Sequence, residues 1–354
     1  STPKPSSAAS DVYKRQHGRA KQMTWKNPPS KVRLSLGSAI LLGLAEGRLD
    51  AEPTTIYMLT YKRGKCSANC AFCPQSRTSG GRADMLSRIV WPTFQTVDVI
   101  PRVAKVFNTG KIARVCIQAL NYPSVLEDIW SLVKQLRESS QVPISVSCQP
   151  LTKTDMQRLV TAGVNRVGIA LDAVTKDLFD CIKGASVGGP YQWDTHLKAL
   201  AEAVEVFGKN NVSTHLIVGL GETEREFVAM IQKCVDLGVY PALFAFTPVQ
   251  GTKLANRKAP SIMSYRRMQV AHYLITRGIA RYGDMRFEAG RLVSFGIPKT
   301  ELLRIIRTGE PFKTSGCPGC NRPYYNERPG GPIYNFPREL TDAEIAEIEK
   351  VLCV

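Results

Sequence analysis

From Thr54 onward, short apolar runs rich in β-branched and aromatic residues alternate with longer segments that carry apolar residues at helical spacing. The strand-like runs occupy residues 55–60, 113–118, 144–148, 166–170, 213–218 and 242–246. The helical patterns occupy residues 91–106, 125–136, 153–162, 193–207, 224–237 and 264–281. Such alternation predicts βα units around a parallel sheet, and hence an α/β fold of the TIM type, a partial to complete (βα) barrel. In such barrels the chemistry lies at the C-terminal ends of the strands.

The same pattern divides the chain into three parts. Residues 1–29 are polar and are predicted to be disordered, and part of this segment (7–16) looks like a cloning or assembly scar. Residues 30–281 form the predicted barrel together with an N-terminal helix over Ser35–Leu49, for which Ser35 or Ser38 could be the cap. Residues 282–354 form a C-terminal extension, whose irregular segment 316–337 is dense in Pro, Gly and Tyr. A helix over 341–352 ends the chain, and Thr341 with Glu344 predicts a capping box.

Composition limits the compartment and the partners. The longest apolar run, residues 39–45, is too short to span a membrane, so no membrane partner is expected. Ten cysteines without an apolar secretory segment indicate cytoplasmic thiols that act as ligands or catalytic groups. A net charge of +17 favours an acidic partner, although it could also serve solubility alone. No nucleic-acid-binding motif is visible, so a nucleic-acid partner is not expected, and an acidic macromolecular substrate is held open.

Three closely spaced cysteines follow the first predicted strand. Cys66, Cys70 and Cys73 have the spacing C-x3-C-x2-C. Thiolates are the usual ligands of iron–sulfur clusters, and three ligands on one loop would leave one iron open for catalysis. Phe72 adds a flat apolar face beside the third cysteine. The alternative is a structural zinc knuckle, but a strand end in an α/β barrel is where active sites lie.

This motif resembles that of the radical S-adenosylmethionine (SAM) superfamily. The resemblance implies that Cys66, Cys70 and Cys73 hold a [4Fe-4S] cluster, that SAM binds the open iron, and that an external electron donor reduces the cluster. SAM is then cleaved to a 5′-deoxyadenosyl radical, which abstracts hydrogen from an unactivated carbon. The resemblance also assigns the contacts to SAM: the ribose to Asp172, which could instead cap a helix, and the adenine to Gly219, Gly221, Glu222 and Phe246.

Within this superfamily, the segment CAFCPQS resembles biotin synthase, a sulfur-inserting enzyme. Cys116 and Cys148 match two positions where that family holds a second, sulfur-donating cluster. Ser213 stands where the family has its third cysteine, which puts biotin synthase activity in doubt. Arg291, in the segment FEAGR, matches the position of that family's arginine ligand.

The C-terminal extension carries a further pair, Cys317 and Cys320, at the C-x2-C spacing common in cluster and zinc sites. Together with Cys116 and Cys148 they would supply four thiolates for an auxiliary [4Fe-4S] cluster, provided that the extension folds under or into the barrel. The alternative is that the pair binds zinc or nothing and that Cys116 and Cys148 are core residues. The cysteines in helical patterns are expected to be packing residues: Cys181, Cys234 and Cys353.

The extension also makes the chain resemble one component of the two-component lipoyl synthase found mainly in archaea. That resemblance implies a sulfurtransferase that inserts sulfur into a protein-bound octanoyl chain. It also implies an acidic lipoyl-carrier protein bearing octanoyl-lysine as the substrate, with a second radical SAM component as a partner. Lys62, Arg63 and Lys65 could meet such a carrier. The alternatives are biotin synthase acting on dethiobiotin, another radical SAM reaction such as methyl or methylthio transfer, and a zinc- or cluster-bearing interaction protein without catalysis.

Overall fold

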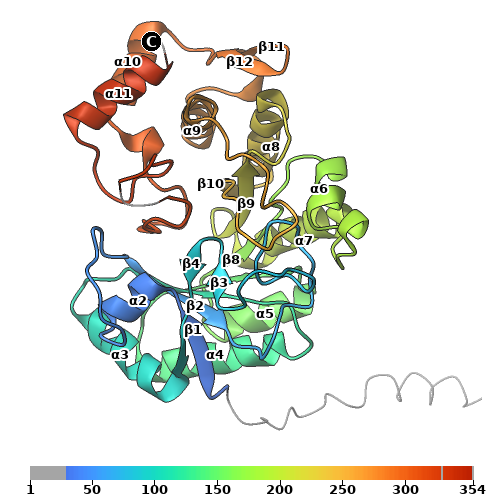
Figure 1. Cartoon of the computed structure of the whole chain (residues 1–354), viewed down its shortest axis with the longest axis vertical. Coiled ribbons are helices and arrows are strands. Elements are labelled where there is room, and N and C mark those ends of the chain that lie inside the picture. Colours follow the sequence, from blue (N-terminus) through green and yellow to red (C-terminus); the bar gives the residue numbers. More distant parts are fainter. Residues whose placement is uncertain (1–28, 328–329, 353–354) are drawn as a thin grey trace, which may run out of the picture.

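The computed structural model describes residues 29–327 and 330–352, and a curved eight-stranded sheet forms its centre (Figure 1). Its strand order is β10-β9-β8-β7-β6-β2-β1-β5. Six neighbouring strands run parallel, namely β2 (Thr55–Thr60), β6 (Arg114–Gln118), β7 (Ile144–Cys148), β8 (Arg166–Ile169), β9 (Val212–Val218) and β10 (Val239–Ala245). The sheet ends at β10 and β5 without closing. The prediction of an α/β fold with a partial barrel is therefore confirmed.

Helices connect the parallel strands and follow one another around the outside of the sheet (Figure 1). They are α3 (Thr96–Asn108), α4 (Val125–Ser139), α5 (Lys153–Thr161), α6 (Lys176–Ile182), α7 (Trp193–Phe207) and α8 (Glu224–Asp236), and α9 (Ile262–Thr276) follows the last parallel strand. Each amphipathic helix turns its apolar side to the sheet; in α4, for example, Ile129, Val133 and Leu136 are fully buried. The main core lies between the sheet and these helices. Among the described helices, none is both long and apolar enough to cross a bilayer.

The N-terminal region differs from the prediction. A strand, β1 (Lys31–Leu34), pairs antiparallel with β2 and with β5 (Thr93–Gln95), so the sheet gains two strands that the sequence did not reveal. The helix expected over Ser35–Leu49 is only α2 (Leu36–Leu41). Ser35 is its cap, since its hydroxyl accepts the N–H of Ser38 at 3.3 Å. The helix ends early because Gly43 takes a left-handed conformation with φ +66°, which reverses the chain.

The remaining elements are short. A small hairpin, β3 (Met85–Leu86) with β4 (Ile89–Val90), follows the cysteine loop, and a second, β11 (Arg286–Glu288) with β12 (Arg291–Ser294), follows α9. Two helices belong to the C-terminal extension, α10 (Lys299–Arg307) and α11 (Asp342–Leu352). Three single turns of 3-10 helix complete the list: Ala185–Val187, Tyr282–Asp284 and Glu310–Phe312. The capping box is confirmed, because Thr341 N donates to Glu344 Oε2 at 2.8 Å and Glu344 N to Thr341 Oγ1 at 3.3 Å.

Residues 313–327, here called the tail segment, cross the open side of the barrel. At the β10 edge, Leu243 N donates to Ser315 Oγ at 2.7 Å. At the start of β2, Thr54 N donates to Asn321 Oδ1 at 3.0 Å. The tail segment therefore bridges the two ends of the parallel sheet and brings its own side chains to the interior of the barrel.

Candidate functional site

Strand register defines an inner row of side chains across the parallel sheet. Because side chains alternate between the two faces of a strand, residues that pair across neighbouring strands point to the same side. One such row is Tyr57, Cys116, Ser145 and Arg166. The next row, two residues further along each strand, is Leu59, Gln118, Ser147, Gly168 and Ser213. All of these residues line one cavity of about 280 Å³ inside the barrel.

The cysteine loop closes this cavity at the C-terminal ends of the strands. Cys66, Cys70 and Cys73 all line it, as does Phe72. The sulfur of Cys66 accepts the backbone N–H of Asn121 at 3.1 Å, which is a contact suited to a thiolate ligand. The three predicted ligands are thus brought to one wall, and the space beside them is where SAM would bind.

The donor chemistry of this wall fits an iron–sulfur cluster. Burial raises the pKa of Cys70 to about 12 and raises that of Cys73 even more, so these thiols need a bound cation to lose their protons. A cluster attaches each thiolate to a different iron, so its ligands stand farther apart than those of a single ion. Within the described residues, no three His, Cys, Asp or Glu side chains converge on one point as a zinc ion would require.

Asp172 lies in the cavity just beyond β8. Its backbone is left-handed, with φ +65°, which an aspartate tolerates better than most residues do. Its carboxylate is buried and pairs with the ammonium of Lys183 at 2.7 Å, and the same ammonium donates to Ala170 O at 2.7 Å. The helix-cap interpretation is wrong, because Thr175 caps α6. Asp172 is instead a fixed acceptor that faces the cavity lined by the three cysteines.

The other predicted SAM contacts do not all lie in the cavity. Phe246 lines the cavity, but Gly219, Gly221 and Glu222 do not. Both oxygens of Glu222 accept backbone N–H groups of its own turn, from Gly219 at 2.6 Å and from Leu220 at 2.9 Å. A side chain at Gly219 would collide with Pro260, at 2.9 Å from an added Cβ atom. This motif therefore shapes the turn after β9 rather than the wall of the cavity.

A second group of thiols lines the opposite end of the cavity. Cys116 on β6 meets Cys317 and Cys320 of the tail segment there. The hydroxyl of Tyr57 lies 3.1 Å from Cys320 Sγ and that of Ser145 lies 3.8 Å from Cys317 Sγ. Burial raises the pKa of Cys116, and the two neighbouring thiols raise it further. The extension therefore folds into the barrel, as an auxiliary site would require.

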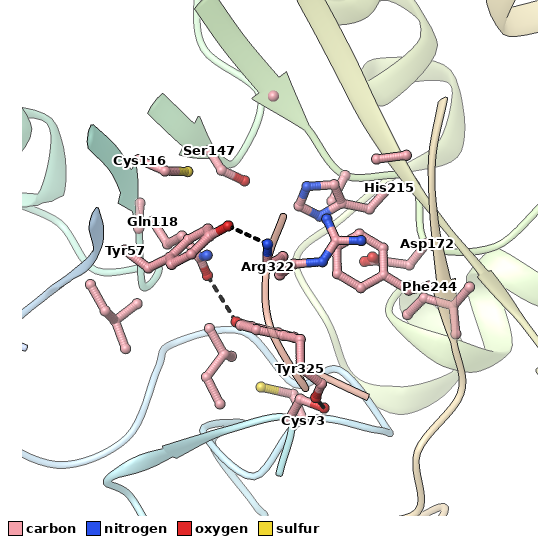
Figure 2. Close-up of a pocket in the computed structure, with 18 of the residues that line it drawn as sticks. Tyr57, Cys73, Cys116, Gln118, Ser147, Asp172, His215, Phe244, Arg322 and Tyr325 are labelled. Carbon is pink, nitrogen blue, oxygen red and sulfur yellow. Dashed lines mark hydrogen bonds between the residues drawn. The ribbon is translucent and has the colours of Figure 1, made fainter. Parts of the chain in front are cut away.

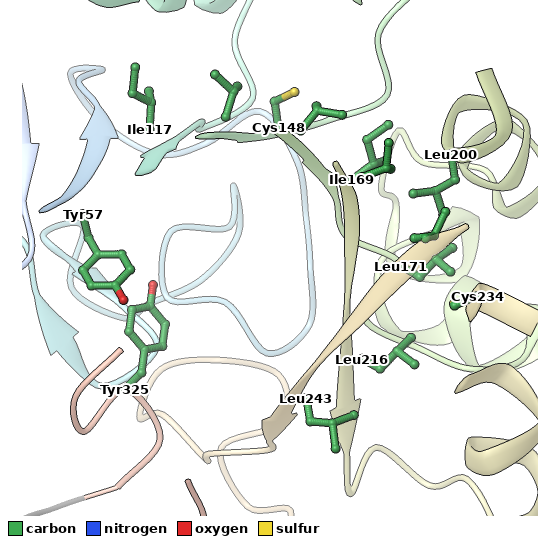
Figure 3. Close-up of a cluster of buried hydrophobic side chains, with 14 of the residues drawn as sticks. Tyr57, Ile117, Cys148, Ile169, Leu171, Leu200, Leu216, Cys234, Leu243 and Tyr325 are labelled. Atoms are coloured by element: carbon green, nitrogen blue, oxygen red, sulfur yellow. The ribbon is translucent and has the colours of Figure 1, made fainter. Parts of the chain in front are cut away.

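Cys148 does not join this group, and its prediction as an auxiliary ligand is wrong. On β7 the residues that line the cavity include Ser145 and Ser147, so the next residue points to the other face of the sheet. Figure 3 shows Cys148 on the outer side, among the core residues Ile117 and Ile169. Burial without a neighbouring charge raises its pKa to about 12. It is a packing residue, which leaves three thiols at the auxiliary site.

Replacing Cys148 with alanine is accordingly expected to leave the iron content unchanged and to lower the free energy of unfolding by about 1 kcal/mol, the cost of a small cavity. Iron analysis of the reconstituted protein and urea unfolding of the metal-free protein would measure the two effects. Loss of a whole cluster's iron in this variant would contradict the assignment of Cys148 to the outer face.

Arg322 fills the centre of the cavity and was missed by the sequence analysis. Its guanidinium lies 3.8 Å above the ring of Phe244 and donates to Leu243 O at 3.1 Å, and its backbone N–H donates to Tyr57 Oη at 2.9 Å (Figure 2). Burial raises the pKa of Cys320, whereas the charge of Arg322 lowers it. Arg291, the expected arginine ligand, is instead exposed on β12 with its guanidinium 3.8 Å from Met263 Sδ.

The expectations for the cysteines in helical patterns and for the cations near the cysteine loop are confirmed only in part. Cys234 is buried on α8 as expected, but Cys181 is exposed on α6, and Cys353 lies outside the described residues. Lys65 is committed to the cysteine loop, because its ammonium donates to Pro74 O at 2.6 Å and to Gly81 O. Lys62 donates to Lys65 O at 2.8 Å. These two lysines organise the loop, and of the three cations only Arg63 is exposed.

Residues 63–234 match the model of the radical SAM superfamily, so this part of the chain is similar to a radical SAM domain. Its curated relatives include the biotin synthases of Pelodictyon phaeoclathratiforme and of Clostridium acetobutylicum. The first is 25% identical over 66% of this chain and 66% of its own length. The second is 24% identical over 65% of this chain and 68% of its own length. The match thus spans about two thirds of each relative.

Solved structures agree on the fold. Methylornithine synthase superimposes with a TM-score of 0.50 at 16% identity, covering 63% of either chain. HydG, a maturase of the [FeFe]-hydrogenase, superimposes with a TM-score of 0.50 at 14% identity, covering 60% of this chain and 48% of its own. At these identities the likeness concerns the barrel alone. The superfamily implies one [4Fe-4S] cluster and SAM as cofactors.

Proposed function

We propose that this enzyme is a sulfurtransferase that takes sulfur from an auxiliary iron–sulfur cluster and inserts it at an unactivated C–H bond. The observation that carries the proposal is the presence of two groups of three thiols at opposite ends of one cavity. With its cofactors bound, the first site would supply a 5′-deoxyadenosyl radical and the second would supply sulfur. A substrate carbon held between them could meet both.

In this proposal, the residues of the chain have the following roles. Cys66, Cys70 and Cys73 would hold the SAM-binding cluster, and Asp172 would accept the ribose hydroxyls of SAM. The auxiliary group would be held by Cys116, Cys317 and Cys320. Between the two ends, the rings of Phe244 and Tyr325 pack edge-on with centroids 6.1 Å apart, and Tyr325 donates to Gln118 Oε1 at 3.2 Å (Figure 2). These side chains would exclude water from the path of a carbon radical.

The substrate that we propose is an octanoyl chain on the lysine of an acidic lipoyl-carrier protein. The cavity supports this, because its lining is largely apolar, with Leu59, Leu86 and Phe246 among its walls. The net charge of +17 suits an acidic carrier. The resemblance of the C-terminal extension to a two-component lipoyl synthase adds a second radical SAM protein as a proposed partner. The biotin synthase relatives favour free dethiobiotin as the second candidate.

The first experiment is iron and sulfide analysis with Mössbauer spectroscopy on the reconstituted protein and on the variant Cys317→Ala/Cys320→Ala. We expect about eight irons in the parent and about four in the variant, since each [4Fe-4S] cluster takes four. Cys148→Ala is the matched control and should keep both clusters. One cluster, unchanged by loss of the pair, would remove the basis for sulfur insertion.

Turnover then separates the two substrates. The reconstituted enzyme is expected to release 5′-deoxyadenosine and to form a carbon–sulfur bond on an octanoylated carrier protein, as measured by mass spectrometry of the carrier. Formation of biotin from dethiobiotin, with no change in the octanoyl carrier, would instead establish the second candidate.

A further inference from the structure

Three loops at the C-terminal end of the barrel contain no acidic residue. They are the cysteine loop (61–83), the segment after α6 (183–192) and the loop after β10 (246–261). The same loops hold nine of the lysines and arginines of the chain: Lys62, Arg63, Lys65, Arg77, Arg82, Lys183, Lys253, Arg257 and Lys258. In a chain with 30 acidic residues, this makes one end of the barrel a source of positive potential.

The structure packs these loops together. Leu254 N donates to Ala71 O at 3.2 Å and Arg77 N donates to Ala68 O at 2.8 Å. The side chain of Leu254 joins an apolar cluster with Phe72 and Phe246. The loop after β10 is therefore fixed directly against the backbone between the cysteines.

Six cations on these loops are exposed. Arg82 pairs with Asp84, and Arg77, Lys253, Arg257 and Lys258 are here called the basic patch. Arg77 donates to Gly188 O at 2.9 Å and Lys253 to Val187 O at 3.4 Å, so both side chains bridge to the segment after α6. Within the part of the chain that the structure describes, none of the four pairs with a carboxylate. Their charges are open to an external partner.

The basic patch lies on the side of the cysteine loop away from the cavity. Cys66, Cys70 and Cys73 line the cavity, whereas none of the four cations does. Ala68 and Ala71, to which the neighbouring loop residues bond, are buried between the two sides. Arg77 follows Cys73 by four residues on the cysteine loop, and Lys253 precedes Leu254, whose N–H donates to Ala71 O between Cys70 and Cys73. Electrons can pass through packed protein from such a surface to the thiols, whereas an acyl chain must enter the cavity, which the patch does not line.

We propose that the basic patch is the docking site of a small acidic one-electron carrier protein that reduces the cluster held by Cys66, Cys70 and Cys73. This inference rests on the proposed function only in requiring that cluster. The step is a single electron transfer: the carrier is oxidised by one electron, the cluster is reduced by one electron, and no bond is made or broken. The unpaired cations would attract and orient the carrier, and this attraction would weaken with salt.

The test compares two double variants with the same change in net charge. Arg257→Glu/Lys258→Glu reverses half of the basic patch, and Lys299→Glu/Arg304→Glu reverses two exposed cations on α10, in the C-terminal extension. Each reconstituted protein is mixed with reduced flavodoxin in a stopped-flow instrument at low ionic strength, and cluster reduction is followed by its absorbance. Photoreduced deazaflavin, a small neutral reductant, serves as the reference.

We expect the patch variant to be reduced by flavodoxin at least about tenfold more slowly than the parent, with the difference shrinking as salt is added. The α10 variant and all reactions with deazaflavin should match the parent. Equal slowing in both variants, or none in either, would overturn the docking site. So would a patch variant that loses affinity for an acidic octanoyl carrier while flavodoxin reduces it normally. Failure of deazaflavin to reduce the parent would instead count against the cluster itself and hence against the proposed function.

Discussion

Replacing Cys73 with alanine is expected to abolish reductive cleavage of SAM. The cavity holds three thiols for the first cluster, so the variant would lose a direct ligand of a site that has none to spare. Loss of an outer-shell partner typically costs 10- to 100-fold in metal affinity or activity, so loss of a ligand should exceed about 100-fold. The measurement is 5′-deoxyadenosine formed from SAM with dithionite, together with iron content. The auxiliary site should keep its iron.

Cys234→Ala is the control for this prediction, because Cys234 is a buried thiol that lies on α8 outside the cavity. It should cleave SAM at the rate of the parent. A Cys73→Ala protein that retains about half of the parent's SAM cleavage would show that this thiol is no ligand.

Replacing Lys183 with methionine is expected to destabilise the metal-free protein by about 3–5 kcal/mol. The side chains of Lys183 and Asp172 are 5% and 10% exposed and lie 2.7 Å apart, so the variant would leave a buried carboxylate without its counter-charge. Urea unfolding followed by circular dichroism would give the difference in free energy. SAM binding should also weaken, because the carboxylate would lose its fixed orientation.

The double variant Lys183→Met/Asp172→Asn tests whether the unpaired charge on Asp172 causes the loss of stability. An amide in place of the carboxylate removes the unpaired charge, so most of the lost stability should return. If the double variant were as unstable as the single one, the loss would come from packing around Lys183 and not from the charge on Asp172.

The parallel strands and the first cysteine site could be predicted from sequence because their signals are local. Each strand is a short apolar run, and Cys66, Cys70 and Cys73 lie within eight residues on one loop. The strands β1 and β5 were missed because they have four and three residues, too few to show a period. Both strands are stabilised by pairing with a strand that is distant in the sequence, and the residues of the two segments do not indicate that pairing.

The auxiliary site was predicted only in part because it depends on orientation. The sequence indicated that Cys317 and Cys320 would have to enter the barrel, and the structure places them beside Cys116. The prediction for Cys148 was wrong because side chains alternate between the two faces of a strand, and Cys148 lies on the outer face. The polar residues Ser145 and Ser147 indicated which face of this strand is the inner one. Arg322 gave no signal at all. The position of Arg322 is determined by the path of an irregular segment, in which the backbone of Arg322 itself has φ +34°.

The tail segment also sets an order of events during synthesis. Cys66, Cys70, Cys73 and Cys116 leave the ribosome some two hundred residues before Cys317. Residues 313–327 are among the later parts of the chain to be made, and they are the ones that bridge the two ends of the parallel sheet. The auxiliary thiols can meet only when the last part of the chain arrives. Because the tail segment supplies two of the three auxiliary thiols and also bridges the ends of the parallel sheet, the auxiliary group is complete only when the open side of the barrel is closed.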